Sequence, residues 1–220
     1  MTPIPRVAPE GVRLVTRAGA PPSWYPSVKR LVDVVSAAAA LVVLFPVLAI
    51  IAVVIWVESP GTVIFTQYRT GLHGRRFRMY KFRTMVADAE ERKAELAHLN
   101  ELPWPDFKIT DDPRITTIGR FLRKTSLDEL PQLVNVLLGQ MSLIGPRPTS
   151  FAANTYDLWH TERLEVRPGL TGLWQVSGRN ETTFDERLRM DIEYVRGVSP
   201  QTDLRILGRT LGEIVRGGGE

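Results

Sequence analysis

The sequence has no cysteine among its 220 residues and only three histidines, His73, His98 and His160. The lack of cysteine excludes disulfide bonds, thiolate zinc sites, iron–sulfur clusters and a cysteine nucleophile. The scattered histidines argue against a histidine-based metal cluster. Thiol and thiolate chemistry is therefore excluded.

Hydrophobic residues make up 44% and charged residues 24% of the chain, both near the globular average, so wholesale disorder is not expected. The length predicts one domain, with room for an appendage. The net charge of +4 favours anionic partners, such as phosphates, acidic lipid surfaces or nucleic acid, without choosing among them. These averages conceal one block that is almost entirely apolar.

The apolar block is Val34–Val57, roughly 24 residues without a charge, bounded by Asp33 and Glu58. A helix needs about 20 apolar residues to cross the hydrocarbon layer of a membrane, so the block is long enough. A secretory signal peptide is excluded because some thirty mostly polar residues come first. The alternative, a buried helix of a soluble protein, normally keeps a polar face that this block lacks.

Two features favour a helix that enters the membrane and returns over one that spans it. Pro46, in the middle of the block, removes a backbone donor and predicts a kink. Basic residues mark the cytoplasmic side of membrane segments. Here they stand on both sides of the block: Arg6, Arg13, Arg17, Lys29 and Arg30 before it, and Arg69, Arg75, Arg76, Arg78, Lys81 and Arg83 after it. Both ends are therefore expected on the cytoplasmic side.

The rest of the chain predicts a mostly helical α+β fold with a small β element. The expected strands are Thr62–Gln67 and Phe77–Phe82, and the expected helices are Val86–Leu99, Ile115–Lys124, Leu127–Leu138, Thr183–Arg196 and Pro200–Arg216. Pro103–Pro113, Gly145–Pro148 and Pro168–Arg179 are expected as loops. The last helix has an apolar stripe at Leu204, Leu207, Leu211, Ile214 and Val215 that suits either the core or a bilayer surface, and it leaves dimerisation open.

Ser126-Leu127-Asp128-Glu129 allows two interpretations. One is a capping box, in which the Ser126 side chain caps a helix and the Glu129 carboxylate reaches back to the backbone amide of Ser126. The other is a carboxylate pair at a site, in which one carboxylate attacks phosphorus and the other holds a divalent cation. A hard cation with oxygen ligands would offset the repulsion between an anionic nucleophile and an anionic diphosphate.

Basic residues supply candidate phosphate ligands. Lys81 and Arg83 alternate with aromatic residues at strand spacing and precede Thr84, a pattern typical of the wall of a binding site. By contrast, Arg75, Arg76 and Arg78 also suit a patch that faces anionic lipid. Arg147 stands between Pro146 and Pro148, which favours a pre-positioned guanidinium for phosphate over a solvated loop arginine. Arg179 follows a glycine-rich loop, which is weak support by itself.

Five segments, in this order, resemble the bacterial sugar transferase family, also called the monotopic phosphoglycosyl transferases. They are Lys29-Arg30 with Asp33, Lys81–Met85, Thr125–Gln132, Ser142–Pro148 and Pro168–Gly172, and the resemblance runs from about Lys29 to about Leu211. It implies transfer of a sugar 1-phosphate from a UDP-sugar to a polyprenyl phosphate such as undecaprenyl phosphate, with release of UMP, at the cytoplasmic face of the bacterial inner membrane. The product starts a membrane-bound glycan, such as an exopolysaccharide, a capsule, an O-antigen or a glycoprotein glycan.

The resemblance also implies roles for individual residues. Asp128 would be the nucleophile that forms a phosphosugar-aspartate, and Glu129, with Asp128, would bind Mg²⁺. Arg147 would contact a substrate phosphate, and Lys81 and Arg83 would lie near the active site. From the residues themselves, we also expect Thr84 and Arg179 among the side chains that bind the substrate phosphates. The family's re-entrant helix breaks at a proline, here Pro46, but Phe45 stands where some members have serine.

The implied organisation is an irregular lead-in over residues 1–28, the re-entrant helix over 29–58 and a membrane-associated catalytic domain with interfacial amphipathic helices over 59–220. The chain resembles the minimal catalytic form of the family. Two other functions stay open from the residues alone: a membrane-tethered scaffold that binds anionic lipids, and a nucleic-acid binder, which no motif supports and which the membrane segment argues against. The sequence does not identify the sugar.

Overall fold

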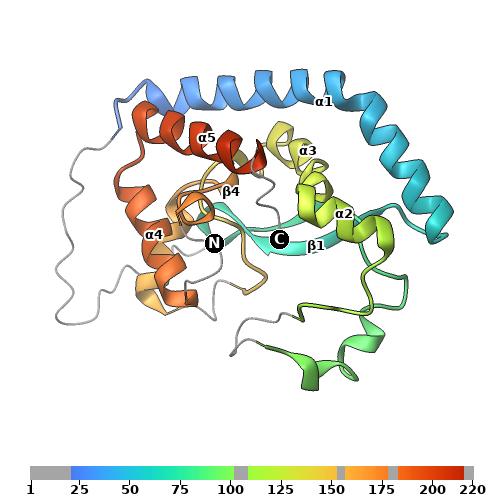
Figure 1. Cartoon of the computed structure of the whole chain (residues 1–220). Helices are drawn as coiled ribbons and strands as arrows, with labels where there is room; N and C mark the ends of the chain where they lie inside the picture. The colour runs from blue at the N-terminus through green and yellow to red at the C-terminus, as the bar shows by residue number, and fades with distance from the viewer. Residues whose placement is uncertain (1–20, 102–108, 153–156, 178–182, 216–220) are drawn as a thin grey trace.

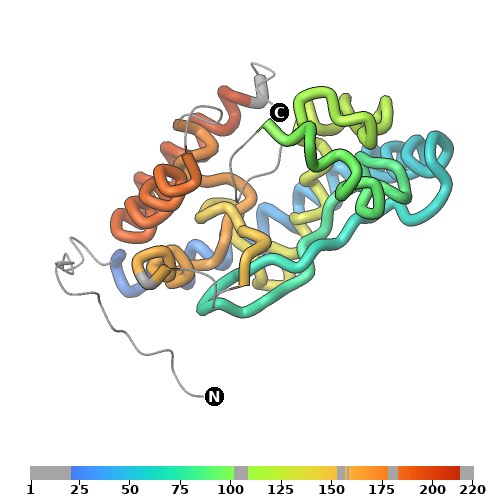
Figure 2. The backbone as a smooth tube through the Cα atoms, turned by 90° about the horizontal axis from the view of Figure 1, so that it is seen from below, coloured from blue at the N-terminus to red at the C-terminus, as the bar shows by residue number. Residues whose placement is uncertain are grey.

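The computed structural model describes residues 21–101, 109–152, 157–177 and 183–215. Figure 1 shows a long helix, α1 (Tyr25–Glu58), across one side of a body made of shorter helices and two small sheets. Viewed from below in Figure 2, helices α4 (Phe184–Arg196) and α5 (Pro200–Val215) lie on one side of the body, and the hairpin of β1 (Ile64–Thr70) and β2 (Arg76–Phe82) lies on the other. The mostly helical α+β fold is confirmed.

Helix α1 bends part-way along its length, in the region of Pro46, and has an arm on either side (Figure 1). The first arm buries Ala37 among side chains of β2 and α3 (Gln132–Leu137). The second arm packs Ile51 and Ile55 against Phe82 and against Leu122 of α2 (Thr117–Thr125). Within the described chain, α1 is the helix long and apolar enough to cross a membrane.

Most apolar side chains of α1 are exposed, in contrast to those of a core helix. The exposed ones include Leu31, Val35, Val42, Val43, Phe45, Ile50, Val53 and Trp56. A soluble protein rarely leaves so long an apolar surface in water. The packing therefore contradicts the buried-helix alternative.

Polar side chains fix both ends of α1 to the same body. Arg30 donates to the carbonyl oxygens of Val136 and Leu137, at 2.6 and 2.9 Å, where α3 ends. At the other end, Glu58 accepts from the amides of Thr117 and Ile118 at the start of α2. A straight helix of this length would separate its ends by about 50 Å. The bend therefore lets one body hold both arms.

Charges interpreted above as flanks of the membrane segment also have structural partners. Lys29 and Tyr25 bind the Asp203 carboxylate of α5 at 2.5 and 2.6 Å. Asp33, although inside α1, is buried and accepts from the amide of Leu143 at 3.0 Å. The polar residues at the start of α1 therefore dock it on α5 and on β3 (Ser142–Ile144).

The β element consists of two separate two-stranded sheets. The predicted hairpin is confirmed: β1 and β2 are antiparallel, with Ile64 opposite Phe82 and Thr70 opposite Arg76. The second sheet pairs β3 with β4 (Gly169–Thr171) in parallel. Pro168–Arg179, expected to be irregular, therefore contributes a short strand, followed by the 3₁₀ helix η7 (Trp174–Val176).

The expected helix at Val86–Leu99 is wrong. The segment consists of turns and two short 3₁₀ helices, η2 (Glu91–Lys93) and η3 (Ala97–Leu99). None of its residues is buried, so its alanines and leucines lack the packing that supplies most helix stability in proteins. Helix propensity alone did not determine this segment.

The helices on either side of Ser126 differ in how well they were predicted. Helix α2 confirms the prediction at Ile115–Lys124. The single helix predicted over Leu127–Leu138 is instead a 3₁₀ turn, η4 (Leu127–Glu129), followed by α3, with Pro131 at the cap between them. Gly139, with φ of +76°, follows α3, as the expected helix end requires.

The two C-terminal helices are confirmed. Thr183 caps α4 in a capping box with Glu186, and the Ser199 hydroxyl accepts from the amide of Thr202 in α5. In α5, Ile206 faces the core, whereas Leu204, Leu207 and Leu211 are exposed. These three leucines of the predicted stripe therefore do not pack on the core. The side chains of Ile214 and Val215 lie outside the described ones.

Candidate functional site

The segment Ser126–Glu129 connects two helices. The amide of Ser126 closes the last turn of α2, and its φ of +57° turns the chain into η4. Its side chain makes no capping hydrogen bond, so the capping-box interpretation is wrong. Leu127 packs on the cluster around Ile55 and Phe82, and Leu130 packs on the cluster around Leu133. Asp128 and Glu129 lie between these two apolar anchors.

Glu129 is held by two cations from distant parts of the chain. The ammonium of Lys81, on β2, lies 2.7 Å from Oε1 of Glu129. The guanidinium of Arg147 lies 2.8 Å from the same oxygen and 3.4 Å from Oε2. The structure therefore brings together four of the predicted site residues, because the Lys81 ammonium also lies 3.8 Å from Asp128.

Buried Asn135, in α3, fixes β2 relative to the carboxylates. Its side-chain oxygen accepts from the amide of Tyr80 at 3.0 Å, and its nitrogen donates to the carbonyl of Arg78 at 2.7 Å. These two bonds imitate a neighbouring strand along the open edge of β2. Since α3 begins three residues after Glu129, this docking places Lys81 beside the carboxylates.

The pKa values of the two adjacent carboxylates are shifted in opposite directions. Burial alone would raise the pKa of Glu129, but the charges of Arg147 and Lys81 hold that pKa well below its ordinary value. Burial raises the pKa of Asp128; the Lys81 charge opposes this and the Glu129 charge adds to it. Within the described chain, the Asp128 carboxylate accepts no hydrogen bond. Glu129 is thus an anion fixed by two cations. Asp128 is a buried and more basic carboxylate, which we call open because its oxygens accept no hydrogen bond from the described residues.

The other predicted site residues lie at different places. The guanidinium of Arg83 donates to the carbonyl of Ser59, just beyond α1, rather than to the carboxylates. The hydroxyl of Thr84 accepts from Nε of Arg123 at 3.0 Å. Arg179 lies outside the described residues.

Arg123 is a site residue that the sequence analysis missed. It stands in the last turn of α2, and its charge lowers the pKa of Asp128. A basic residue so soon before the carboxylates was the available signal. Thr84 therefore contacts Arg123, whose charge acts on Asp128, rather than the carboxylates themselves.

The arginines of the hairpin make internal contacts. Arg76 donates to the carbonyls of Ser150 and Phe151, and Arg78 lies over the ring of Tyr68. Arg76 thus fixes the segment that follows Pro148. Its contacts reduce the case for a purely lipid-facing patch.

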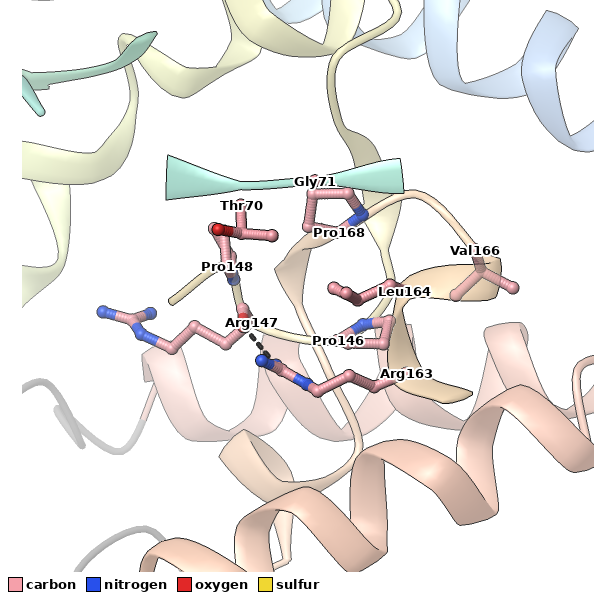
Figure 3. Close-up of a pocket in the computed structure, with 9 residues that line it drawn as sticks. All are labelled: Thr70, Gly71, Pro146, Arg147, Pro148, Arg163, Leu164, Val166 and Pro168. Carbon is pink, nitrogen blue, oxygen red and sulfur yellow. Dashed lines mark hydrogen bonds between the residues drawn. The ribbon is translucent and has the colours of Figure 1, made fainter. Parts of the chain in front are cut away.

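Arg147 projects from the loop after β3 and is supported from behind by Arg163. Figure 3 shows the Arg147 guanidinium pointing away from a small cavity, while Arg163 reaches the main-chain carbonyl of Arg147. Arg163, in the 3₁₀ segment η6 (Leu158–Glu165), also forms a buried ion pair with Asp191 of α4. The sequence analysis missed both residues, since nothing local marks a long-range ion pair.

The arrangement suits chemistry on a phosphorylated substrate. A more basic carboxylate with an open oxygen can attack phosphorus, while Lys81 and Arg147 offer positive charge to the phosphate oxygens. Within the described residues, no group of three or more histidine, aspartate or glutamate side chains could hold a metal ion alone. Carboxylate oxygens are donors that Mg²⁺ accepts, and the ion is commonly held by one or two carboxylates together with substrate phosphates. In the structure, both oxygens of Glu129 contact cations, so Asp128 offers the less engaged carboxylate.

Comparisons with known proteins agree with this chemistry. The family model described as bacterial sugar transferase matches residues 24–217. The galactosyl transferase CpsE of Streptococcus agalactiae is 45% identical over 193 residues, which cover 87% of this chain and 43% of CpsE. The undecaprenyl-phosphate galactose phosphotransferase of Salmonella typhimurium is 42% identical over 196 residues, which cover 86% of this chain and 40% of that protein.

A shorter relative matches over most of its length. The exopolysaccharide production protein ExoY of Rhizobium meliloti is 39% identical over 188 residues, which cover 83% of each chain. By contrast, the chain spans about two fifths of the length of CpsE and of the Salmonella protein.

Proposed function

Because the chain belongs to the bacterial sugar transferase family, we propose that it transfers a sugar 1-phosphate from a UDP-sugar to a polyprenyl phosphate such as undecaprenyl phosphate. The name of the Salmonella relative, an undecaprenyl-phosphate galactose phosphotransferase, supports this acceptor, and the name of ExoY supports a role in exopolysaccharide production. The observation that carries the proposal is the open Asp128 carboxylate beside Glu129, which two cations immobilise.

In the first step, a carboxylate oxygen of Asp128 attacks the phosphorus that bears the sugar. A new bond forms between this oxygen and phosphorus, and the bond from phosphorus to the bridging oxygen breaks. UMP leaves with that oxygen and its electron pair, so the sugar phosphate stays on Asp128 as an acyl phosphate. The raised pKa of Asp128 supports this role, because a more basic oxygen is a better nucleophile once ionised.

In the second step, an oxygen of the polyprenyl phosphate attacks the same phosphorus. The acyl phosphate bond breaks, Asp128 returns as a carboxylate, and the product is a polyprenyl diphosphosugar. The acceptor enters only after UMP has left, so one nucleophile serves both substrates in turn.

The charges around the carboxylates suit both anionic substrates. Lys81 and Arg147, which bind Glu129 in the structure, lie where they can also contact the diphosphate oxygens. Asp128 and Glu129 would hold Mg²⁺, which would neutralise charge on the diphosphate during the transfer. Arg123 adds positive charge on the side of Thr84.

We also propose that α1 enters the cytoplasmic leaflet of the bacterial inner membrane and returns. Its exposed apolar side chains support membrane insertion, and the contacts of Arg30 and Glu58 with one body support both ends on one side. Because the chain contains no cysteine, a single introduced thiol is the only one that can react with a maleimide. Ser23→Cys and Thr66→Cys should each react with an impermeant maleimide only when the cytoplasmic face is exposed; labelling from opposite faces would establish a span.

The covalent step is tested with a donor radiolabelled in its sugar. Without acceptor, the purified protein should release about one equivalent of UMP and retain the label on the protein, and hydroxylamine should remove it. Addition of undecaprenyl phosphate should move the label to lipid. UMP release that strictly requires the acceptor, with no labelled protein, would contradict the covalent step. No UMP release from any of a panel of UDP-sugars would contradict the proposed function.

A further inference from the structure

The loop that presents Arg147 is bound from behind by a buried ion pair. Arg163 donates through Nη2 to the carbonyl oxygen of Arg147 (Figure 3). The same guanidinium binds Oδ2 of Asp191, through Nε at 3.0 Å and through Nη2 at 2.5 Å. Both partners are almost fully buried, with exposed fractions of 3% for Arg163 and 1% for Asp191. The pair therefore connects α4 to the main chain at Arg147.

The loop has few backbone donors with which to fix itself. Arg147 stands between Pro146 and Pro148, and neither proline has an amide hydrogen. Its carbonyl belongs to the peptide bond with Pro148, so the bond from Arg163 fixes that peptide. The orientation of this peptide sets the direction in which the Arg147 side chain leaves the loop towards Glu129.

Arg163 acts on the loop and not on a substrate. The cavity that it lines behind the loop measures about 10 Å³, no more than a single water molecule needs. The Arg147 guanidinium points to the opposite side (Figure 3). Arg163 is therefore separated from the reacting groups by the loop itself.

The ion pair is poorly built for stability. Among the described residues, Oδ1 of Asp191 is buried and has no hydrogen-bond partner. Burial also raises the pKa of Asp191 to about 6, against the charge of Arg163, so keeping this carboxylate ionised opposes folding. Apolar replacements of buried ion pairs are often neutral or stabilising. Stability therefore does not account for these two residues at this place.

We propose that Arg163 and Asp191 are positioning residues that aim Arg147 at Glu129 and at the donor phosphate. The proposal rests on the proposed transferase function. Without the pair, Arg147 keeps its charge but samples several directions, so donor binding and transfer both weaken while the fold persists.

The test replaces the pair with apolar residues, as Arg163→Met with Asp191→Leu in one chain. We expect a melting temperature near that of the parent protein and at least a tenfold lower kcat/KM for UMP release. The matched control is the ion pair of Arg196 with Glu162, which joins the same two elements, α4 and η6, without contacting the loop. Arg196→Gln with Glu162→Gln should leave kcat/KM within twofold of the parent value.

A double-mutant cycle with Arg147→Ala separates positioning from a general structural effect. If the pair acts through Arg147, its replacement causes no further loss of single-turnover rate once Arg147 is alanine. An equal loss in both backgrounds, or an unchanged kcat/KM in the apolar variant, overturns the proposal. If the apolar variant does not fold, Arg163→Lys is scored by the same criteria, because lysine keeps the charge but lacks the planar fork that binds both partners.

The parent protein distinguishes failure of this inference from failure of the proposed function. A parent that releases UMP, together with a fully active pair variant, overturns the positioning role alone. A parent that releases no UMP from any UDP-sugar overturns the proposed function as well.

Discussion

Two segments of this chain share one local pattern and adopt different structures. Ser126-Leu127-Asp128-Glu129 and Thr183-Phe184-Asp185-Glu186 each combine a hydroxyl residue, an apolar residue and two acids. In the second segment, Glu186 accepts from the amide of Thr183 at 2.7 Å and completes a capping box. In the first, Glu129 turns to Lys81 and Arg147, and Ser126 caps nothing.

The difference comes from the surroundings of each segment. Thr183 has an extended backbone, with φ of −65° and ψ of 165°, which leaves its hydroxyl free to cap α4. The amide of Ser126 still closes the last turn of α2, and its backbone is left-handed rather than extended, so its side chain makes no capping bond to the next helix. Two cations then compete for Glu129 more strongly than a backbone amide does. A capping pattern thus becomes a site where a preceding helix and distant cations prevent the cap.

Substitution of the aspartate should have the most different effects on activity in the two segments. Asp128→Asn should reduce UMP release at least about a thousandfold, because an amide oxygen cannot displace UMP. Asp185→Asn, at an exposed position on α4, should leave the rate unchanged. Both are measured as UMP release from a radiolabelled donor. Comparable rates in the two variants would remove Asp128 from the role of nucleophile.

Substitution of the glutamate should have the second largest difference in effect, seen in turnover and in the Mg²⁺ requirement. Glu129→Gln removes the carboxylate charge that Lys81 and Arg147 share and weakens Mg²⁺ binding, so we expect about a hundredfold lower turnover and a higher Mg²⁺ requirement. Glu186→Gln should keep turnover within twofold of the parent value. Titration of turnover with Mg²⁺ measures both. An unchanged Mg²⁺ requirement in Glu129→Gln would exclude Glu129 as a metal ligand.

The pH dependence of the first step should reveal the environment of Asp128. Burial raises its pKa, so UMP release should fall with decreasing pH at a value above the ordinary aspartate pKa of about 3.9. The charge of Lys81 opposes that shift, so Lys81→Met should move the inflection to higher pH, beyond lowering the rate. Single-turnover rates from pH 4 to 8 measure both curves. A shift to lower pH in Lys81→Met would contradict this electrostatic account.

Substitution of the hydroxyl residues should have the smallest effects, which are changes of opposite sign in the free energy of unfolding. Thr183→Ala removes a cap and should lower the free energy of unfolding by about 1 kcal/mol. Ser126→Gly relieves a left-handed backbone and should raise it by roughly 1 kcal/mol. Denaturant unfolding of the protein in nanodiscs provides the measurement. Destabilisation by Ser126→Gly would mean that its side chain stabilises the fold through a contact other than a cap.

Local signals predicted the elements in which the local pattern agrees with a buried face. The hairpin, α2, α4 and α5 follow from alternation, helical periodicity and capping residues. The bend in α1 follows from one proline within a charge-free run. Val86–Leu99 failed because its helix propensity had no buried face to stabilise it.

The candidate site was predictable only in part. Asp128, Glu129, Lys81 and Arg147 follow from residue type and from the family resemblance, and the structure brings them together. The pair Arg163–Asp191 depends on a contact between residues far apart in the chain, and a single sequence gives no measure of such distances. Arg123 stands shortly before the carboxylates, so its local signal was available in the sequence but was not used. The roles of Arg30 and Asp33 in docking α1 were hidden because they too depend on contacts between residues far apart in the chain.

The hydrogen bonds from Arg30 to the carbonyl end of α3 also affect the distance between the carboxylates and the membrane surface. The opposite end of α3 begins three residues after Glu129, so a short rigid rod joins the first arm of α1 to the reacting groups. In a bilayer, that rod sets how far Asp128 stands from the lipid surface. Under the proposed function, the phosphate of the polyprenyl acceptor would therefore be met at a height above the bilayer that the protein, and not the thickness of the membrane, determines.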